Sequence, residues 1–453
     1  MLKSSTDMTR MNDSDPVWLR FLPEIIHKRI KGRTQLHSII HNIWWLLGDK
    51  ALRLGMGLIV GAWVARYLGP SQYGELSYVV AYVAFFQVIS QLGLDEIAIR
   101  DMARDKQKSP AIIGTIFGLR LIAGVICWIC AIGAIVILRP GDYNTLILTA
   151  IIAGGIIFQA ADTIDLWFQS QIQSKRTVVS KAMSYFMTSI LKVVLIIAKA
   201  GLIFFAVVGL VEIALSFAAL MYSYKKFSAP EKLFWDRCLV RQLLMESWPY
   251  MLSGLAIIIY MRIDQIMLRE IMGTAELGYF SAAITLSSIW YFIPVMISQS
   301  VGPSIAKKRS NDSDGYDRSI NNLFSLMWWI MLPLSIVIAL ISSPVITTLY
   351  GKAYSESAVV LSVHVFANIP VGLGVMQGLW IVNENKNTLS LTKTAAGAIS
   401  NVLLNLLLIP RYGAVGAATA TVVSQSISSV FSNIFIAPDI FRRQILCAVW
   451  SYK

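Results

Sequence analysis

The sequence predicts an all-α membrane protein of about twelve transmembrane helices, arranged as two related bundles of six helices. Three observations predict this fold class. The chain of 453 residues is 56% hydrophobic and only 14% charged, whereas soluble domains carry about 25% charged residues, so lipid must cover much of its surface. The apolar residues gather in runs long enough to cross a bilayer. A short turn motif also recurs after 204 residues, each time between two such runs.

Twelve spans account for the apolar runs, because a helix needs about 20 apolar residues to cross a bilayer. They cover residues 38–66, 75–94, 111–138, 146–170, 177–198, 201–223, 243–268, 277–302, 320–342, 357–382, 389–409 and 412–437. Very short turns join the fifth span to the sixth and the eleventh to the twelfth. The loops between spans are too short to hold a folded soluble domain.

The spans define the expected domain organisation. The N-terminal segment is polar and basic, and its residues 18–31 suit either an amphipathic segment on the membrane surface or a mobile tail. A charged linker joins the two bundles, and a short tail ends the chain. These parts are the N-terminal tail 1–37, the bundles 38–223 and 243–437, the linker 224–242 and the C-terminal tail 438–453.

The distribution of Lys and Arg predicts the orientation. Of 39 such residues, 27 fall in the two tails and in every second loop, and only six fall in the remaining loops. Cytoplasmic loops carry the excess of Lys and Arg, so an even number of spans places both termini in the cytoplasm. The net charge of +13 is thus spread over many short loops instead of one face, which does not favour nucleic-acid binding.

The turn motif indicates that the two halves are related. Gly69 and Gly74 in residues 68–78 align with Gly273 and Gly278 in residues 272–282. A second pair of turns, 172–177 and 383–388, aligns at an offset of 211. Six spans per half keep both halves in the same orientation, so the repeats are parallel and related by an axis along the membrane normal. Duplicated membrane bundles of this kind are often transporters, with the substrate path between the halves.

Charged residues inside the spans are the first candidates for a site, because charge at membrane depth is costly and usually faces a cavity. The cations are in excess. If they face one cavity, it is positive and suits a phosphate or an acidic sugar. Lys50 and Arg262 could instead extend to the membrane interfaces. The candidate substrate-binding cations are Lys50, Arg53, Arg120, Lys192 and Arg262.

Acidic and other titratable residues in the spans are candidates for polar cavity positions or for coupling to an ion. Asp162 lies on a polar stripe of the fourth span, where such side chains either line water or bond neighbouring helices. His364 is a lone imidazole that could relay protons or simply pack in the core. The full candidate set is Asp162, Asp165, Glu212, Asp264 and His364.

The sequence gives no indication of an enzyme, a cofactor or a metal site. It contains no phosphate-cradling loop with the pattern G-x-x-x-x-G-K-[ST] and no His/Cys cluster with metal-ligand spacing. Cys127 and Cys130 have C-x-x-C spacing, but both fall in the middle of a span and are best explained as small buried side chains. A membrane polymerase or glycosyltransferase would need a sizeable outer loop, which this chain lacks.

Several motifs resemble those of a known family. They are Arg66-Tyr67-Leu68-Gly69-Pro70 with Gln72-Tyr73-Gly74, Gln91-Leu92-Gly93-Leu94-Asp95 with Arg100, Asp264, Leu349-Tyr350-Gly351 with Tyr354, and Pro410-x-Tyr412-Gly413-x-x-Gly416-Ala417-Ala418. Together they resemble the polysaccharide-repeat flippases of the Wzx type, within the multidrug/oligosaccharidyl-lipid/polysaccharide exporter superfamily. The likeness extends over nearly all of the chain from about residue 40 to residue 437.

This resemblance implies a V-shaped, MATE-like carrier that works by alternating access in the bacterial inner membrane. The implied cargo is an undecaprenyl-pyrophosphate-linked oligosaccharide, moved from the cytoplasmic to the periplasmic leaflet. Membrane lipids and other polysaccharide assembly proteins are the implied partners. A flippase for the peptidoglycan precursor lipid II, or a cation-coupled multidrug exporter of the same superfamily, is the alternative. We expect Arg53→Ala and Arg120→Ala to reduce polysaccharide export without loss of folded protein.

Overall fold

The computed structural model describes residues 34–449, except residue 106 and residues 228–232. Every described element is helical. The first bundle contains α2 (Thr34–Gln91), α3 (Asp95–Arg104), α4 (Ser109–Leu138), α5 (Tyr143–Phe158), α6 (Asp162–Ser170), α7 (Lys175–Ile197) and α8 (Leu202–Phe227). The second contains α9 (Arg237–Met272), α10 (Thr274–Ser288), α11 (Phe292–Asn311), α12 (Ser313–Leu340), α13 (Ser342–Leu349), α14 (Glu356–His364), α15 (Asn368–Asn383), α16 (Asn387–Ser426), α17 (Asn433–Ile436) and α18 (Pro438–Val449). The amphipathic segment predicted at 18–31 lies outside the described residues.

Within the described residues, ten helical runs are long and apolar enough to cross a membrane. Two of these runs each contain two helices that meet at a glycine. The first kink lies at Gly69 in α2 (φ 74°, ψ 169°) and the second at Gly413 in α16 (φ 53°, ψ −132°). Positive φ is strained for residues with a side chain and open to glycine. The prediction of about twelve transmembrane helices is therefore confirmed.

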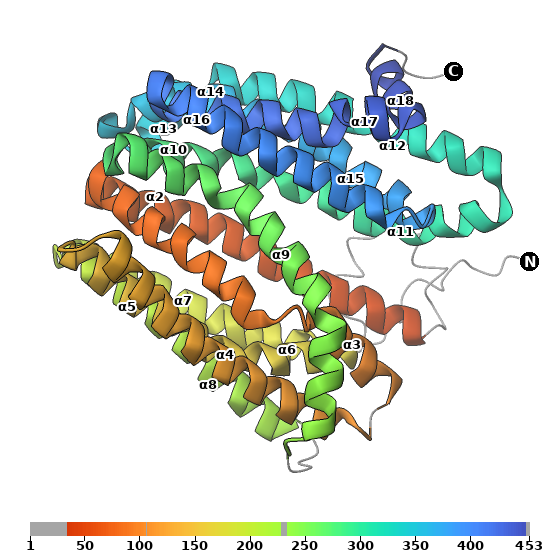
Figure 1. The fold of residues 1–453 in the computed structure, drawn as a ribbon, viewed down its shortest axis with the longest axis horizontal. Coiled ribbons are helices and arrows are strands. Elements are labelled where there is room, and N and C mark those ends of the chain that lie inside the picture. Colours follow the sequence, from red (N-terminus) through yellow and green to blue (C-terminus); the bar gives the residue numbers. More distant parts are fainter. Residues whose placement is uncertain (1–33, 106, 228–232, 450–453) are drawn as a thin grey trace, which may run out of the picture.

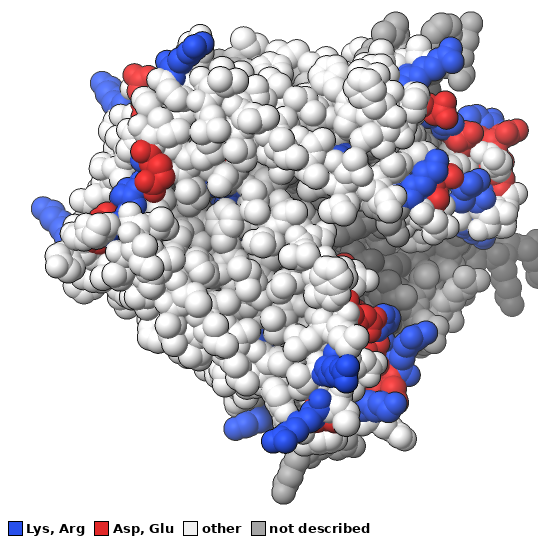
Figure 2. Space-filling view, viewed as in Figure 1, with Lys and Arg blue, Asp and Glu red and all other residues white. Residues whose placement is uncertain are grey.

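The two bundles form a V (Figure 1). They converge at the end where α2 meets α10, called here the closed end, and separate toward the end where α2 begins and α18 ends, called the termini end. Figure 2 shows charged side chains at both ends of the molecule with a broad uncharged band between them, as expected for a bilayer-spanning protein. The same view shows a recess between the bundles at the termini end.

The bundles touch through a reciprocal pair of glycines at the closed end. A Cβ on Gly74 would lie 1.8 Å from the carbonyl oxygen of Thr274, and a Cβ on Gly278 would lie 2.0 Å from that of Pro70. Because Pro70 and Thr274 are themselves 204 residues apart, each half makes the same contact to the other. Self-complementary contacts of this kind are produced by a two-fold axis. The structure thus confirms the predicted parallel repeat.

The turns of the two halves share backbone conformations even where their sequences differ. Eight of the ten described residues with positive φ recur in pairs: Gly69 with Gly273, Gly141 with Gly351, Ile172 with Asn385, and Lys199 with Gly413. The third pair corrects the predicted alignment of turns 172–177 and 383–388, because the equivalent residues lie 213 positions apart instead of 211. The predicted alignment matched the side chains of Lys175 and Lys386. The backbone shows instead that Gln173 and Lys386 are equivalent, because the amide of each donates to the carbonyl oxygen five residues earlier.

Three segments predicted as loops or a tail are helical. The predicted loop 95–110 contains α3, and the predicted loop 343–356 contains most of α13. In the predicted tail, α18 packs against α12, where its Arg443 pairs with an acidic residue and Trp328 donates to the backbone oxygen of Gln444. The buried side chain of Gln444 also bonds Asn433 and Ser429 near the end of the preceding helix. Short amphipathic helices have too few apolar residues to register as spans, so a hydrophobicity pattern alone treats them as connections.

Helix α9 crosses from the first bundle to the second (Figure 1). Near the termini end it packs on the first bundle, where a Cβ on Gly93 would lie 2.5 Å from the backbone nitrogen of Met251. Toward the closed end it packs on α16 of the second bundle. Pro249 lies inside its course and removes one helix hydrogen bond. Helix α9 therefore closes one side of the recess.

Candidate functional site

Helix α7 carries a polar stripe into the first bundle. Lys181, Tyr185, Thr188 and Lys192 are spaced by four, three and four residues, which places them on one face of a helix. Exposed apolar side chains such as Met183 occupy the rest of the surface of this helix. Burying lysines inside a membrane bundle requires partners, since an unpaired charge there is costly.

Lys192 finds its partner in a cavity of about 500 Å³ between α2, α5, α7 and α8. Its ammonium lies 3.1 Å from the carboxylate of Glu212, which also accepts a hydrogen bond from Thr188 at 3.2 Å. The ring of Tyr185 faces two cations, with Arg53 5.3 Å and Lys192 5.9 Å from its centroid. We name Arg53, Tyr185, Lys192 and Glu212 the first-bundle cluster.

Gly57, which has no side chain, makes room for this cluster. A Cβ on Gly57 would lie 2.9 Å from the hydroxyl of Tyr185, so a larger residue would push the ring away from Arg53. Tyr185 was not among the residues predicted from the sequence. Its spacing from Lys192 on α7 could have indicated it, but aromatic residues at helical spacing are far more often ordinary packing residues.

A second cluster lies on α6 and α7. Lys181 donates to Asp162 at 2.8 Å and to Asp165 at 2.6 Å, so one cation holds two carboxylates. The two aspartates were candidate cavity residues, whereas Lys181 was not singled out from the sequence. The aspartates are three positions apart, which places them on one face of their helix. Two carboxylates so close together require a nearby cation.

Arg120 is buried at 4% exposure and pairs with Asp95, just beyond the end of α2. It also donates to the backbone oxygen of Gln91 at 3.4 Å. The surrounding core includes Ile116 and Leu166. The structure therefore places Arg120 in an ion pair that anchors the turn between α2 and α3.

This pairing changes the expectation for Arg120→Ala. We now expect the substitution to lower the free energy of unfolding by about 1–2 kcal/mol, because the buried Arg120 side chain would no longer hold the half-exposed Asp95 and the backbone oxygen of Gln91. Thermal unfolding in detergent, with Arg120→Lys as the control that keeps the charge, measures this. An Arg120→Ala protein as stable as wild type would contradict it.

The candidates in the second bundle are separated from the first-bundle cluster. Asp264 is buried and accepts hydrogen bonds from the hydroxyl of Thr421 at 3.2 Å and from the amide of Gln265 at 2.8 Å. Arg262 donates to the side chain of Gln265 at 3.4 Å. His364 is buried against Phe280, and its Nδ1 lies 2.7 Å from the hydroxyl of Ser287. The structure thus places His364 in the buried core of the second bundle.

One further cation appears in the second bundle. Lys393 donates to the side chain of Gln377 at 3.3 Å and to the backbone oxygen of Gly374 at 3.5 Å, both uncharged groups. Among the residues that the structure describes, no carboxylate lies within ion-pair distance of its ammonium. Lys393 falls inside the predicted span 389–409 and lies inside α16, although it was counted among the 27 cations of the tails and loops.

The predicted cations therefore do not gather in one place. Arg53 and Lys192 lie together in the first-bundle cluster, while Arg120 and Arg262 lie elsewhere. Lys50 lies on α2, but its side chain falls outside the described residues. Paired carboxylates offset much of the positive charge that the sequence led us to expect. In the first-bundle cluster, Lys192 and Glu212 line the cavity, and Arg53 lies against the ring of Tyr185, which lines it too.

An ion network joins the bundles at the closed end. Arg269 of α9 lies 3.4 Å from Glu75 and 3.2 Å from Asp142, both in the first bundle. Arg139 lies 2.5 Å from Glu270 of α9. Burial would lower the pKa of Arg139, but its hydrogen bonds with Glu270 and Tyr78 outweigh this effect and hold the pKa above its ordinary value. We name these residues the closed-end network.

The chain matches a family and several relatives. A family model described as "Polysaccharide biosynthesis protein" matches residues 39–308, more than half of the chain. The putative O-antigen transporter of Shigella dysenteriae is 22% identical over 365 residues, covering 79% of this chain and 90% of that protein. The probable flippase AglR of Haloferax volcanii is 27% identical over 177 residues, covering 38% of this chain. That match spans only 37% of the length of AglR.

Solved transporters share the fold. An inward-facing multidrug resistance transporter of the MATE family has a TM-score of 0.73 at 14% identity, covering 87% of this chain and 96% of that chain. The lipid II flippase MurJ in an inward closed conformation has a TM-score of 0.70 at 15% identity, covering 90% of this chain and 91% of that chain. At such low identity, the likeness concerns the fold alone, and it confirms the predicted MATE-like arrangement.

Proposed function

The chain belongs to the polysaccharide biosynthesis protein family as a Wzx-type flippase, and on that premise we propose that it moves an undecaprenyl-pyrophosphate-linked oligosaccharide from the cytoplasmic to the periplasmic leaflet. The repeat unit would then pass to other polysaccharide assembly proteins. The excess of Lys and Arg on the loops of one side supports an inner-membrane orientation with both termini in the cytoplasm.

The observation that carries this proposal is the first-bundle cluster. A pyrophosphate cannot cross bare hydrocarbon, because charge at membrane depth is too costly. Lys192 lines a cavity of about 500 Å³ and Arg53 lies against the Tyr185 ring in its wall, so each can offer charge-assisted hydrogen bonds to an anion. Glu212 pairs with Lys192 and neutralises its charge. An arriving anionic head group replaces that carboxylate as the partner of Lys192, and Glu212 must then take up a proton or a cation.

Transport then follows from rocking of the two bundles around their contact at the closed end. The closed-end network holds this end shut while the recess at the termini end receives the head group. Separation of Arg269 from Glu75 and Asp142 opens the opposite end. The polyprenyl tail stays in the bilayer throughout, so only the polar head group needs a hydrated path.

Substitution of the cluster lysine tests the role of the cations. We expect Lys192→Ala to lower the initial rate of flipping about tenfold or more, since a charge-assisted hydrogen bond contributes about 1.5–3 kcal/mol. Lys352→Gln removes an exposed lysine at the closed end and is the matched control. Equal rates for Lys192→Ala, Lys352→Gln and wild type, at equal amounts of folded protein, would remove the cluster from the substrate path.

Complementation tests the substrate class. We expect the chain to restore surface polysaccharide in a bacterial strain that lacks its own O-antigen flippase. Two parallel strains address the alternatives: one depleted of its lipid II flippase, and one lacking its multidrug exporters. If the chain does not restore polysaccharide but supports growth of the strain depleted of its lipid II flippase, it is a lipid II flippase. If it instead gives drug resistance to the strain without multidrug exporters, it is a multidrug exporter.

A further inference from the structure

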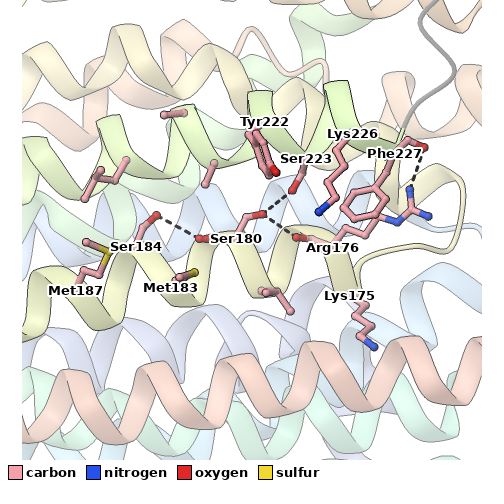
Figure 3. Close-up of a pocket in the computed structure, with 14 residues that line it drawn as sticks. Lys175, Arg176, Ser180, Met183, Ser184, Met187, Tyr222, Ser223, Lys226 and Phe227 are labelled. Carbon is pink, nitrogen blue, oxygen red and sulfur yellow. Dashed lines mark hydrogen bonds between the residues drawn. The ribbon is translucent and has the colours of Figure 1, made fainter.

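A groove of about 670 Å³ runs along the first bundle between α7 and α8. Figure 3 shows its lining residues, which come from these two helices. Helix α7 packs on α2 and α6, and α8 packs on α2, α5 and α6, all elements of the first bundle. The groove therefore opens on the outer face of this bundle, separate from the first-bundle cluster.

The wall of the groove is apolar because its hydroxyl groups are already bonded. Ser180 and Ser223 lie 2.8 Å apart and join α7 to α8, while Ser184 donates to the backbone oxygen of Ser180 at 3.2 Å (Figure 3). Met183 and Met187 flank the groove at 66% and 54% exposure. Flexible methionine side chains adapt to irregular apolar ligands, and an acyl chain is such a ligand.

One end of the groove is basic. Arg176 donates to the backbone oxygen of Phe227 at 3.1 Å and lies 4.3 Å from the centroid of its ring, while Lys226 lies 5.4 Å from the same centroid. Figure 3 shows Arg176 and Lys226 at the same end of the groove, whereas Lys175 points away from it. None of the described lining residues is acidic. This end belongs to the turn before α7, on the side of the termini.

We propose that this groove binds an anionic phospholipid of the surrounding bilayer, with its phosphate at Arg176 and Lys226 and an acyl chain along Met183 and Met187. Two cations at the end of an apolar groove complement one phosphate attached to an apolar chain. Basic residues at the membrane surface attract anionic lipids with about 1 kcal/mol each. The basic end lies at the level where such head groups lie, because it follows directly on the termini-side turn.

Retention of lipid by the full-length protein tests whether the two cations of the groove bind the phosphate. Native mass spectrometry after exchange into phosphatidylglycerol or phosphatidylcholine micelles counts the bound lipids. We expect wild type to retain phosphatidylglycerol, and the double variant Arg176→Gln/Lys226→Gln to bind it about thirtyfold more weakly. Lys225→Gln is the matched control, since Lys225 neighbours Lys226 but does not line the groove. Equal retention by the double variant, an equal loss in Lys225→Gln, or equal retention of phosphatidylcholine would overturn the proposal.

A second variant tests whether the apolar wall of the groove binds the acyl chain, and it leaves the two cations in place. Met183→Trp should fill the groove and reduce retention of phosphatidylglycerol, while Phe186→Trp, on the same helix but outside the groove, should not. Millimolar glycerol 3-phosphate should fail to displace the lipid, because it has no acyl chain. Displacement by this head group alone, or unchanged retention in a folded Met183→Trp protein, would contradict a phospholipid as the occupant.

Discussion

A disulfide between cysteines at positions 71 and 274 is expected to stop transport completely and reversibly. Ser71 and Thr274 belong to different bundles, and their hydroxyl oxygens lie 2.9 Å apart at the closed end. A disulfide holds its two sulfur atoms about 2.05 Å apart, so Ser71→Cys/Thr274→Cys would fix the bundles together where alternating access requires them to separate. Flipping in membrane vesicles should fall to background on oxidation and return on reduction.

Suitable controls isolate the crosslink. The four native cysteines, Cys127, Cys130, Cys238 and Cys447, are first replaced. Each single variant, Ser71→Cys or Thr274→Cys, should then keep its rate under the same oxidation. Full transport by a protein that is quantitatively crosslinked would show that the closed end does not open during the cycle, and the rocking mechanism would be wrong.

Gly74→Ala is expected to reduce transport to near background although it adds a single methyl group. The new Cβ would lie 1.8 Å from a backbone oxygen of the other bundle, and a backbone atom of a packed helix cannot move aside cheaply. In the Gly74→Ala protein this clash forces the bundles apart at the closed end and so favours the state that is open on that side. Helix propensity acts the other way, since alanine stabilises a helix interior by about 0.5–1 kcal/mol relative to glycine. Lost transport in a stable protein therefore has a steric cause.

Gly133→Ala provides the matched control, because no heavy atom lies within 4 Å of its added Cβ. We expect wild-type transport from it. Labelling of a cysteine placed at Ser71 by a membrane-impermeant maleimide should be faster in the Gly74→Ala background than in the Gly133→Ala background. Wild-type transport and labelling in Gly74→Ala would contradict the tight contact of the bundles.

The sequence was sufficient for the fold because the membrane imposes strong and simple rules. Apolar runs predicted the helices, and the glycines at 69, 74, 273 and 278 predicted the repeat. These glycines are visible in the sequence because positive φ at two of them and helix contact at the other two both exclude larger residues. The register of the turns at Ile172 and Asn385 was not predictable from residue identity, since backbone hydrogen bonds define those turns and tolerate several side chains.

The candidate site was only partly predictable, because a sequence shows where charges are but not which charges meet. Arg53 and Lys192 meet at the ring of Tyr185, and Lys192 pairs with Glu212, although these residues come from three different helices. The partner of Arg120 is Asp95, which the sequence offered only as part of a family motif. Lys393 lies inside α16, yet the loop-charge pattern counted it with a turn. Tertiary packing of separate helices decides all of these cases, and no local pattern encodes it.

Reconstitution into proteoliposomes tests the central claim most directly. A fluorescent undecaprenyl-pyrophosphate-linked oligosaccharide is placed in vesicles, and the fraction accessible to a membrane-impermeant quencher is followed over time. We predict that vesicles with wild-type protein expose the lipid from both leaflets. The oxidised Ser71→Cys/Thr274→Cys protein should leave about half of it protected, as in vesicles without protein. Vesicles with the Lys192→Ala protein should expose the lipid of both leaflets, but slowly. A wild-type protein that leaves the inner-leaflet lipid protected, or a crosslinked protein that exposes it fully, would contradict the account.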